Sequence, residues 1–152
     1  MMMHLPRRWL TSNSIGARTT QLALVLIIGV PSLAQAKTDS DYEKLYDQCV
    51  DKVIKENHLA GINNGVVDAC TNHVSELTKK EMNRLYKTFY DRLNQESPED
   101  AKQFENSQKS WLTYRNSHCQ LMGRYVGSPM YGFCPMQLNI ARVSELKELV
   151  GE

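Results

Sequence analysis

The chain has 152 residues, of which 41% are hydrophobic and 23% are charged, and its formal net charge is +1 at pH 7. Residues 1–36 contain three arginines and no acidic residue, so residues 37–152 carry 15 basic and 17 acidic side chains, a net charge of −2 with His neutral. Because these basic side chains are scattered, they offer no basic face to a phosphate backbone, and we expect no nucleic-acid partner.

Residues 1–36 have the layout of a secretory signal peptide. The three arginines precede an apolar run from Leu22 to Val30, Pro31 interrupts it, and Ala34 and Ala36 provide the small side chains that a signal peptidase recognises. This run is much shorter than the about 20 residues of a membrane-spanning helix, which disfavours the alternative of a retained anchor. We therefore predict cleavage after Ala36 and a single mature domain, residues 37–152, in the periplasm or outside the cell. No stable membrane insertion is expected after cleavage.

The first helix is predicted from about Ser40 to Ile54. Ser40 and Glu43 have the spacing of a capping box, and the apolar residues that follow recur at intervals of three and four. Asn57 and Gly61 mark the predicted end of this helix.

Apolar residues with helical spacing continue from Val66 to Leu93. Thr78 and Glu81 could form a second capping box, which would divide this stretch into two helices. The pattern leaves open whether the stretch is one bent rod or two helices. Residues 94–98 are expected to form a turn in either case.

The next helix has a clear predicted start. Ser97 is a suitable N-cap, and Pro98 suits the first helical position because no amide hydrogen is lost there. Glu99 and Asp100 complement the positive end of the helix dipole. We therefore predict a helix that begins at Pro98 and extends to about Cys119.

After Cys119 the helical pattern stops, and the segment from Gly123 to Phe133, rich in Gly, Pro and aromatic residues, is predicted to be a loop. Helical spacing resumes after Cys134 and ends before Gly151. No stretch alternates polar and apolar residues for long enough to predict a strand. The predicted fold class is therefore all-α: a small disulfide-stabilised bundle of four to five helices, with a cystine-bounded loop between the last two.

Four cysteines, Cys49, Cys70, Cys119 and Cys134, lie in the predicted mature part. An even number in a small exported domain predicts two disulfides, and four cysteines allow three pairings. We expect Cys49–Cys70 and Cys119–Cys134 because each pair joins neighbouring elements across one turn. The second would close a loop of about fifteen residues and contribute roughly 3 kcal/mol. A metal site is disfavoured, since there is no CxxC pair and the histidines lack the spacing of zinc ligands.

Two arginines, Arg115 and Arg142, fall on the inward faces of their predicted helices. Because an unpaired buried charge is costly, each should bind backbone carbonyls of the predicted loop or a carboxylate such as Glu105 or Glu145. Together with Trp111, these arginines are predicted to anchor the loop to the bundle. Direct contact with a partner is the alternative.

Within the predicted loop, the candidate partner-binding residues are Arg124, Tyr125, Ser128 and Tyr131. Tyr and Arg are enriched in interface hot spots, and a constrained loop loses less entropy on binding. The alternative is an ordinary surface loop, because aromatic side chains also anchor loops to cores.

The chain lacks the motifs of common enzyme classes. It contains no Gly-rich phosphate loop, no HExxH and no GxSxG, and its cysteines are expected to be oxidised. We therefore expect a protein that is not an enzyme, with no catalytic residue, no metal and no cofactor. A cell-wall hydrolase with two facing carboxylates stays open as an alternative, because a sequence cannot show such a cleft.

One spaced pattern runs through the second half of the chain: Gln108-x-x-Trp111-x-x-Tyr114-Arg115-x-x-x-Cys119, then Gly127-Ser128, then Cys134 with Leu138, Arg142 and Leu146. It resembles the lysozyme inhibitor LprI-like domain of exported bacterial proteins. Met82-Asn83-x-x-Tyr86 is similar to an upstream helix of that family, and the likeness covers roughly Cys49 to Leu149. The resemblance implies an exported helical domain with disulfides.

Three functions compete at this point. The favoured one is a periplasmic binding protein that inhibits a lysozyme or another peptidoglycan hydrolase, with residues 124–131 blocking its cleft and an Arg or Tyr engaging its catalytic carboxylates. The second is an immunity or adaptor protein that binds a specific exported toxin or envelope partner. The third is an enzyme that acts on the cell wall itself.

Overall fold

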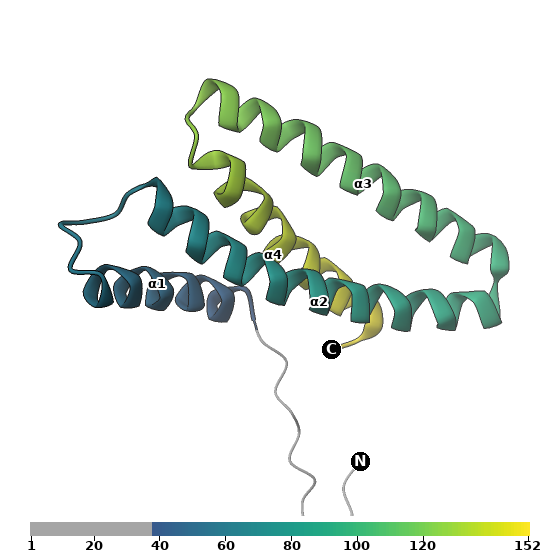
Figure 1. The fold of residues 1–152 in the computed structure, drawn as a ribbon. Coiled ribbons are helices and arrows are strands. Elements are labelled where there is room, and N and C mark those ends of the chain that lie inside the picture. The colour runs from purple at the N-terminus through teal and green to yellow at the C-terminus, as the bar shows by residue number, and fades with distance from the viewer. Residues whose placement is uncertain (1–37) are drawn as a thin grey trace, which may run out of the picture. The chain divides into compact units, whose positions relative to one another are not determined.

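The structure is a computed structural model that describes residues 38–152. The predicted signal peptide and its cleavage after Ala36 lie outside the described residues. Four helices follow (Figure 1): α1 (Asp39–Glu56), α2 (Asn64–Glu96), α3 (Pro98–Tyr125) and α4 (Met130–Val150). No strand occurs within this part of the chain, and the predicted all-α bundle is confirmed. None of these four helices contains an apolar stretch that could cross a bilayer.

Thr38, and not Ser40, caps the start of α1. The backbone N–H and the hydroxyl of Thr38 both donate to Oδ2 of Asp41 at 2.8 Å, and these hydrogen bonds lower the pKa of Asp41. The prediction of Ser40 with Glu43 is therefore wrong by two residues, because Thr38 and Asp41 have the same spacing and Ser40 lies inside the helix. Asn57 ends α1 as predicted.

α2 is one continuous helix of 33 residues, about 50 Å long. Thr78 lies buried in its middle, where its hydroxyl donates to the backbone carbonyls of Val74 at 3.0 Å and Ser75 at 3.1 Å. Because this hydroxyl bonds to the preceding turn, it does not act as a cap and does not interrupt the helix. The choice between one rod and two helices is thus decided in favour of one.

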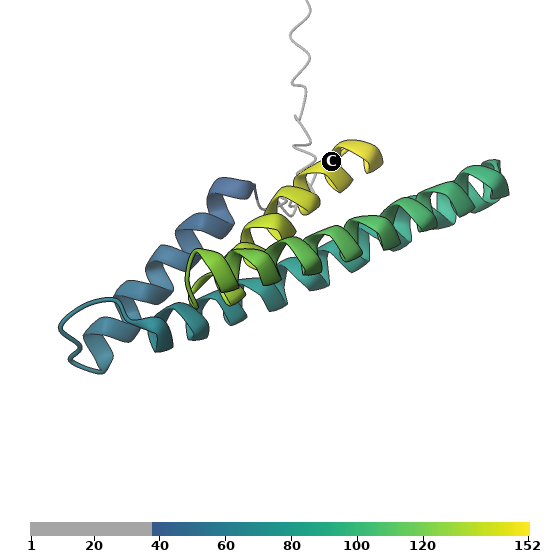
Figure 2. The same ribbon diagram turned by 90° about the horizontal axis from the view of Figure 1, so that it is seen from above.

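The junction between α2 and α3 agrees with the prediction. Oγ of Ser97 accepts a hydrogen bond from the N–H of Asp100 at 3.4 Å, and Pro98 is the first residue of α3. α2 and α3 therefore form a long hairpin that turns at Ser97; the two helices contact each other, and α3 lies over α2 when the molecule is seen from above (Figure 2).

The core lies where α4 crosses α2, since α4 contacts each of the other helices and α2 most extensively. Its buried side chains come from all four helices: Tyr42, Val74, Met82, Leu85, Phe104, Met136, Ile140, Val143 and Leu146. A smaller cluster of Val50, Val66 and Cys70 lies between α1 and α2. The two ends of this bundle therefore differ: one is the turn at Ser97, and the other carries both the α1–α2 and the α3–α4 connections (Figures 1 and 2).

The connection between α3 and α4 is much shorter than predicted. α3 continues to Tyr125 and α4 begins at Met130, so the predicted loop from Gly123 to Phe133 is mostly helical and its extent is wrong. The physical reason is packing: Gly123 is buried and lets the ring of Tyr131 lie directly on α3. Gly127, with φ of 149°, makes the turn itself.

Candidate functional site

Both predicted disulfides are present. Cys49–Cys70 joins α1 to α2 with a Cα–Cα distance of 5.6 Å, and Cys119–Cys134 joins α3 to α4 with a Cα–Cα distance of 5.5 Å. Each disulfide thus links the two helices that flank one of the connections at the same end of the bundle. Among residues 38–152, no group of three or more His, Cys, Asp or Glu could hold a metal ion.

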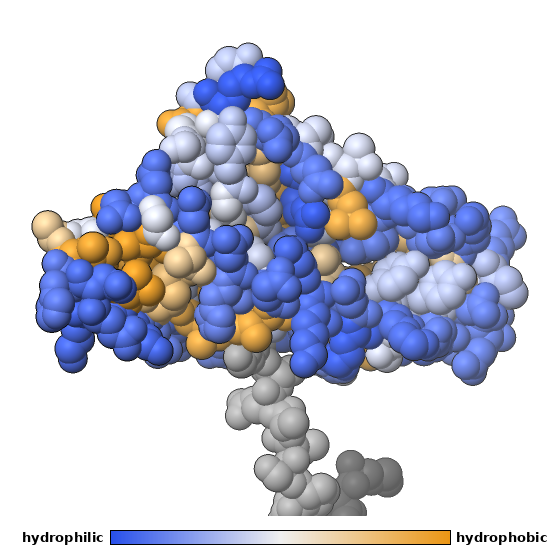
Figure 3. Space-filling model, in the orientation of Figure 1, coloured by the Kyte–Doolittle hydropathy of each residue, from blue (hydrophilic) through white to orange (hydrophobic). Residues whose placement is uncertain are grey.

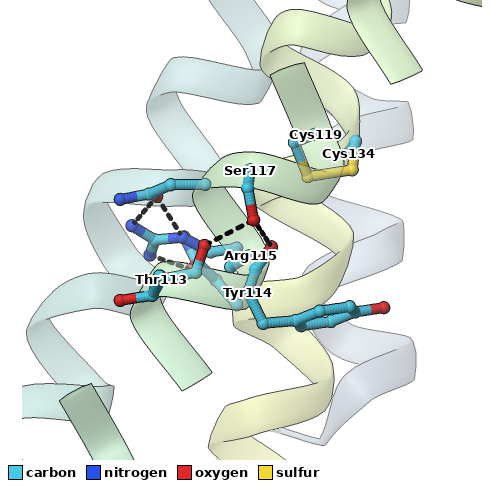
Figure 4. The surroundings of a disulfide bond; sticks show 8 residues. Thr113, Tyr114, Arg115, Ser117, Cys119 and Cys134 are labelled. Carbon is cyan, nitrogen blue, oxygen red and sulfur yellow. Dashed lines mark hydrogen bonds between the residues drawn. A yellow bond between two sulfur atoms is a disulfide. The ribbon is translucent and has the colours of Figure 1, made fainter. Parts of the chain in front are cut away.

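The Cys119–Cys134 disulfide holds the end of α3 against the beginning of α4 (Figure 4). Beside it, the hydroxyl of Ser117 donates to the carbonyls of Thr113 and Tyr114 at 2.8 and 3.2 Å, so this polar group is satisfied within α3. Figure 4 also shows the side chains of Tyr114 and Arg115 pointing to opposite sides of the helix.

The four candidate partner-binding residues lie together around the α3–α4 connection. Arg124 and Tyr125 belong to the last turn of α3, Ser128 to the connection, and Tyr131 to the first turn of α4. Tyr125 is 77% exposed and Tyr131 is 48% exposed. Ser128 accepts a hydrogen bond from Nδ2 of Asn64 at 2.8 Å, so the connection is tied to the start of α2.

Arg124 differs from the other four arginines of residues 38–152. Its exposed guanidinium has no hydrogen bond, ion pair or aromatic partner within this part of the chain. Arg84, by contrast, is held by two carboxylates, and Arg92 donates to a backbone carbonyl. A free guanidinium beside two exposed tyrosines is suited to bind a carboxylate of another molecule.

Trp111, Arg115 and Arg142 form one cluster between α3 and α4. The guanidinium carbons of Arg115 and Arg142 lie 5.4 and 5.5 Å from the centroid of the Trp111 ring, within range of cation–π attraction. Nη1 of Arg115 donates to Oδ1 of Asn139 on α4 at 2.8 Å, and its Nε and Nη2 donate to Oδ1 of Asn116. Burial lowers the pKa of Arg115, because the charged form is partly removed from water.

Arg142 has one of the carboxylate partners that the sequence predicted. Its Nη1 donates to Glu145 at 2.6 Å, and its Nε donates to Oε1 of the buried Gln108 at 3.0 Å. Among the described residues, no hydrogen bond of Arg115 or Arg142 reaches residues 123–133. The cluster therefore joins helix to helix, and it positions the connection only through α3 and α4.

Sequence reasoning assigned no role to three polar residues that shape this region: Asn64, Asn139 and Gln108, although Gln108 belongs to the spaced pattern around Trp111. Asn139 is completely buried, with Oδ1 bonded to Arg115 and Nδ2 without a partner in the described part of the chain. An Asn on the apolar face of the last helix is a detectable signal, because a buried amide needs partners. The contact of Asn64 with Ser128 joins residues 64 positions apart and has no local signal.

The carboxyl groups with shifted pKa values test the alternative that the protein is itself a cell-wall hydrolase. Hydrogen bonds with Lys102 and Lys109 lower the pKa of Glu105 to about 2, and a hydrogen bond with Arg84 lowers that of Glu81. A glycosidase needs a general acid whose pKa is raised so that it stays protonated at neutral pH. These groups are shifted in the opposite direction and are unsuited to that role.

The packing of Tyr131 on Gly123 gives a first prediction. A Cβ at position 123 would overlap the ring of Tyr131, so Gly123→Ala should force the ring outwards and lower the free energy of unfolding by about 1 to 3 kcal/mol. Gly61→Ala is the matched control, because a Cβ there meets nothing within 4 Å. Urea unfolding of both variants measures the difference. Equal midpoints for Gly123→Ala and the parent protein would show that this contact is not tight.

A family model described as lysozyme inhibitor LprI matches residues 60–146. No curated protein and no solved structure matches the chain. The matched span includes α2, α3, most of α4 and three of the four cysteines, and it contains the whole α3–α4 connection.

Proposed function

Because the chain belongs to the lysozyme inhibitor LprI family, we propose that it is an exported protein that binds and inhibits a lysozyme or another peptidoglycan hydrolase. The family match over more than half of the chain carries this proposal. The two disulfides support an extracytoplasmic location, since disulfides persist in oxidising compartments. A signal peptide cleaved after Ala36 is part of the same proposal. The protein acts by binding and is not itself an enzyme.

The α3–α4 connection is the proposed inhibitory element. Lysozymes and other glycosidases cleave glycosidic bonds with a pair of carboxyl groups that flank the bond in a cleft. Arg124, which has no partner within residues 38–152, can form charge-assisted hydrogen bonds with such a carboxylate. The exposed rings of Tyr125 and Tyr131 can cover the cleft on either side. The Cys119–Cys134 disulfide keeps the helix ends in place, so little ordering entropy is lost on binding.

The proposal is tested with the purified protein without residues 1–36 and a panel of lysozymes of the c, g and i types. Loss of turbidity of cell-wall suspensions is followed at increasing inhibitor concentration, and we expect inhibition of at least one enzyme. If a large molar excess inhibits none of them, the proposed function is wrong. Capture of one dedicated exported protein, but no hydrolase, from a periplasmic extract would support the immunity or adaptor function instead.

Arg124→Ala should weaken inhibition by about 30-fold if Arg124 is an interface hot spot, because truncation of a hot-spot residue costs about 2 kcal/mol or more. Lys80→Ala is the matched control: it also removes an exposed positive charge, but at a position about 24 Å along α2 from Asn64. The inhibition constants of both variants are compared with that of the parent protein. Equal losses for the two variants would point to net charge, and not to a specific contact of Arg124.

A further inference from the structure

Charged residues are almost absent from the end of the bundle that carries two connections. Residues 57–67 and 117–136 comprise 31 positions, and Arg124 is the only Asp, Glu, Lys or Arg among them. Such residues make up 23% of the chain, which would place about seven in a stretch of this length. We call the exposed residues of these two segments the charge-poor end.

Burial does not explain this lack of charge. Sixteen of the 31 residues are exposed, and one of the sixteen is charged, whereas 23 of the 44 exposed residues in the rest of residues 38–152 are charged. The exposed side chains of the charge-poor end include large apolar and aromatic groups: Ile62, Leu121, Tyr125, Val126 and Tyr131. In Figure 3, orange and pale side chains gather near the junction of α1 and α2, while the outer part of the α2–α3 hairpin is mostly blue.

The two segments form one continuous surface. Nδ2 of Asn64, at the start of α2, donates to Oγ of Ser128 in the α3–α4 connection at 2.8 Å. Figures 1 and 2 both place the α1–α2 and α3–α4 connections at the same end of the bundle. Each connection is flanked by helices that a disulfide joins. Each connection is therefore held by its own disulfide, and the hydrogen bond between Asn64 and Ser128 links the two connections.

We propose that the charge-poor end is a single docking surface for the acidic substrate cleft of a peptidoglycan hydrolase, and that the α1–α2 connection enters the interface through Ile62 alongside Arg124. This inference rests on the proposed function and extends it to the α1–α2 connection, which precedes the inhibitory α3–α4 connection in the chain. Depletion of charge together with exposed aromatic residues is the composition of an interface core.

The single positive charge argues for an acidic partner. The charge-poor end itself contains no carboxylate, and the exposed Asp68, which borders it beside Gly132, forms no ion pair with Arg124, so the guanidinium is available to an external carboxylate. A cleft that contains two catalytic carboxyl groups supplies this complementary charge, and its sugar-binding walls offer apolar surface for Ile62, which is 64% exposed. A lipid surface would instead favour several basic residues, which the charge-poor end does not have.

The test places charges of opposite sign at position 62. Ile62→Asp should weaken inhibition by at least tenfold, because it removes an apolar contact and brings a negative charge to an acidic cleft. Ile62→Lys should weaken inhibition several-fold less than Ile62→Asp, and the difference should shrink between 0.05 and 0.5 M NaCl as the charges are screened. Leu149→Asp is the matched control: it is an apolar-to-acidic change at a side chain that is 42% exposed and lies outside the charge-poor end. Unchanged urea midpoints exclude unfolding as the cause.

The outcomes separate this inference from the proposed function. If Arg124→Ala loses inhibition but Ile62→Asp inhibits as well as the parent protein, the α1–α2 connection is not in the interface and the inference is overturned. The same conclusion follows if Ile62→Lys and Ile62→Asp are equally weak at low salt, because the cleft is then not acidic. If the parent protein inhibits no hydrolase and instead binds lipid vesicles or dimerises through this end, both the proposed function and the proposed binding partner of the charge-poor end are wrong.

Discussion

Replacing Cys119 and Cys134 together by Ala is expected to lower the free energy of unfolding by about 3 kcal/mol, because the bond closes a segment of fifteen residues in the unfolded chain. Both cysteines are buried, and Ala fills part of their space without adding a polar atom. The same change frees the end of α3 from the start of α4. We therefore also expect weaker inhibition by a protein that is still folded, since the turn beside Arg124 must then be ordered on binding.

Urea unfolding measures the first effect, and inhibition assays well below the unfolding midpoint measure the second. The Cys49→Ala and Cys70→Ala double variant is the control for the stability effect alone, because it removes a bond with a sequence separation of 21 residues and should cost a similar free energy, about 3 kcal/mol. If the Cys119→Ala and Cys134→Ala double variant lost less than about 1 kcal/mol of unfolding free energy, helix packing alone would set the geometry of the α3–α4 connection.

Leu85→Ala is expected to lower the free energy of unfolding by about 3 to 5 kcal/mol, the largest effect predicted for a single substitution. Leu85 is completely buried in α2, within the core that α4 covers, so removal of its side chain leaves a cavity among packed neighbours. This loss is a substantial fraction of the stability of a small domain. Circular dichroism during urea unfolding measures it.

Leu121→Ala is the matched substitution on the surface. Its side chain is 53% exposed and belongs to the charge-poor end. The free energy of unfolding should therefore change by no more than about 0.5 kcal/mol, while inhibition weakens. For Leu85→Ala, inhibition at low temperature should stay near the parent value as long as the protein is folded. If Leu121→Ala lowered the free energy of unfolding as much as Leu85→Ala does, this separation of core from docking surface would be contradicted.

Local chemistry accounts for the parts of the fold that the sequence predicted correctly. Ser97 and Pro98 begin a helix because a cap and a first-turn proline act within four residues. The wrong prediction of Ser40 as the cap of α1 also has a local cause, since Thr38 and Asp41 have the same capping-box spacing two residues earlier. Thr78 resembled a cap, but whether its hydroxyl starts a new helix or bonds to the previous turn depends on what surrounds it.

The extent of the α3–α4 connection could not be predicted in this way. Gly and Pro between residues 123 and 133 usually mark a loop. Here the ring of Tyr131 packs on Gly123, and this contact between two helices makes the glycine favourable inside α3. The candidate residues Arg124, Tyr125 and Tyr131 therefore lie on helix ends, more firmly positioned than a loop would hold them.

The sequence by itself determined the helical class and the two cysteine pairs, because periodicity and capping act over a few residues and both pairs join helices that are consecutive in the chain. Only the tertiary structure decided that Asn64 meets Ser128, that Arg115 meets Asn139, and that Arg124 has no partner in the described part of the chain. These pairings depend on how the helices cross. Crossing is decided by side-chain packing between segments far apart in the chain, which no local pattern contains.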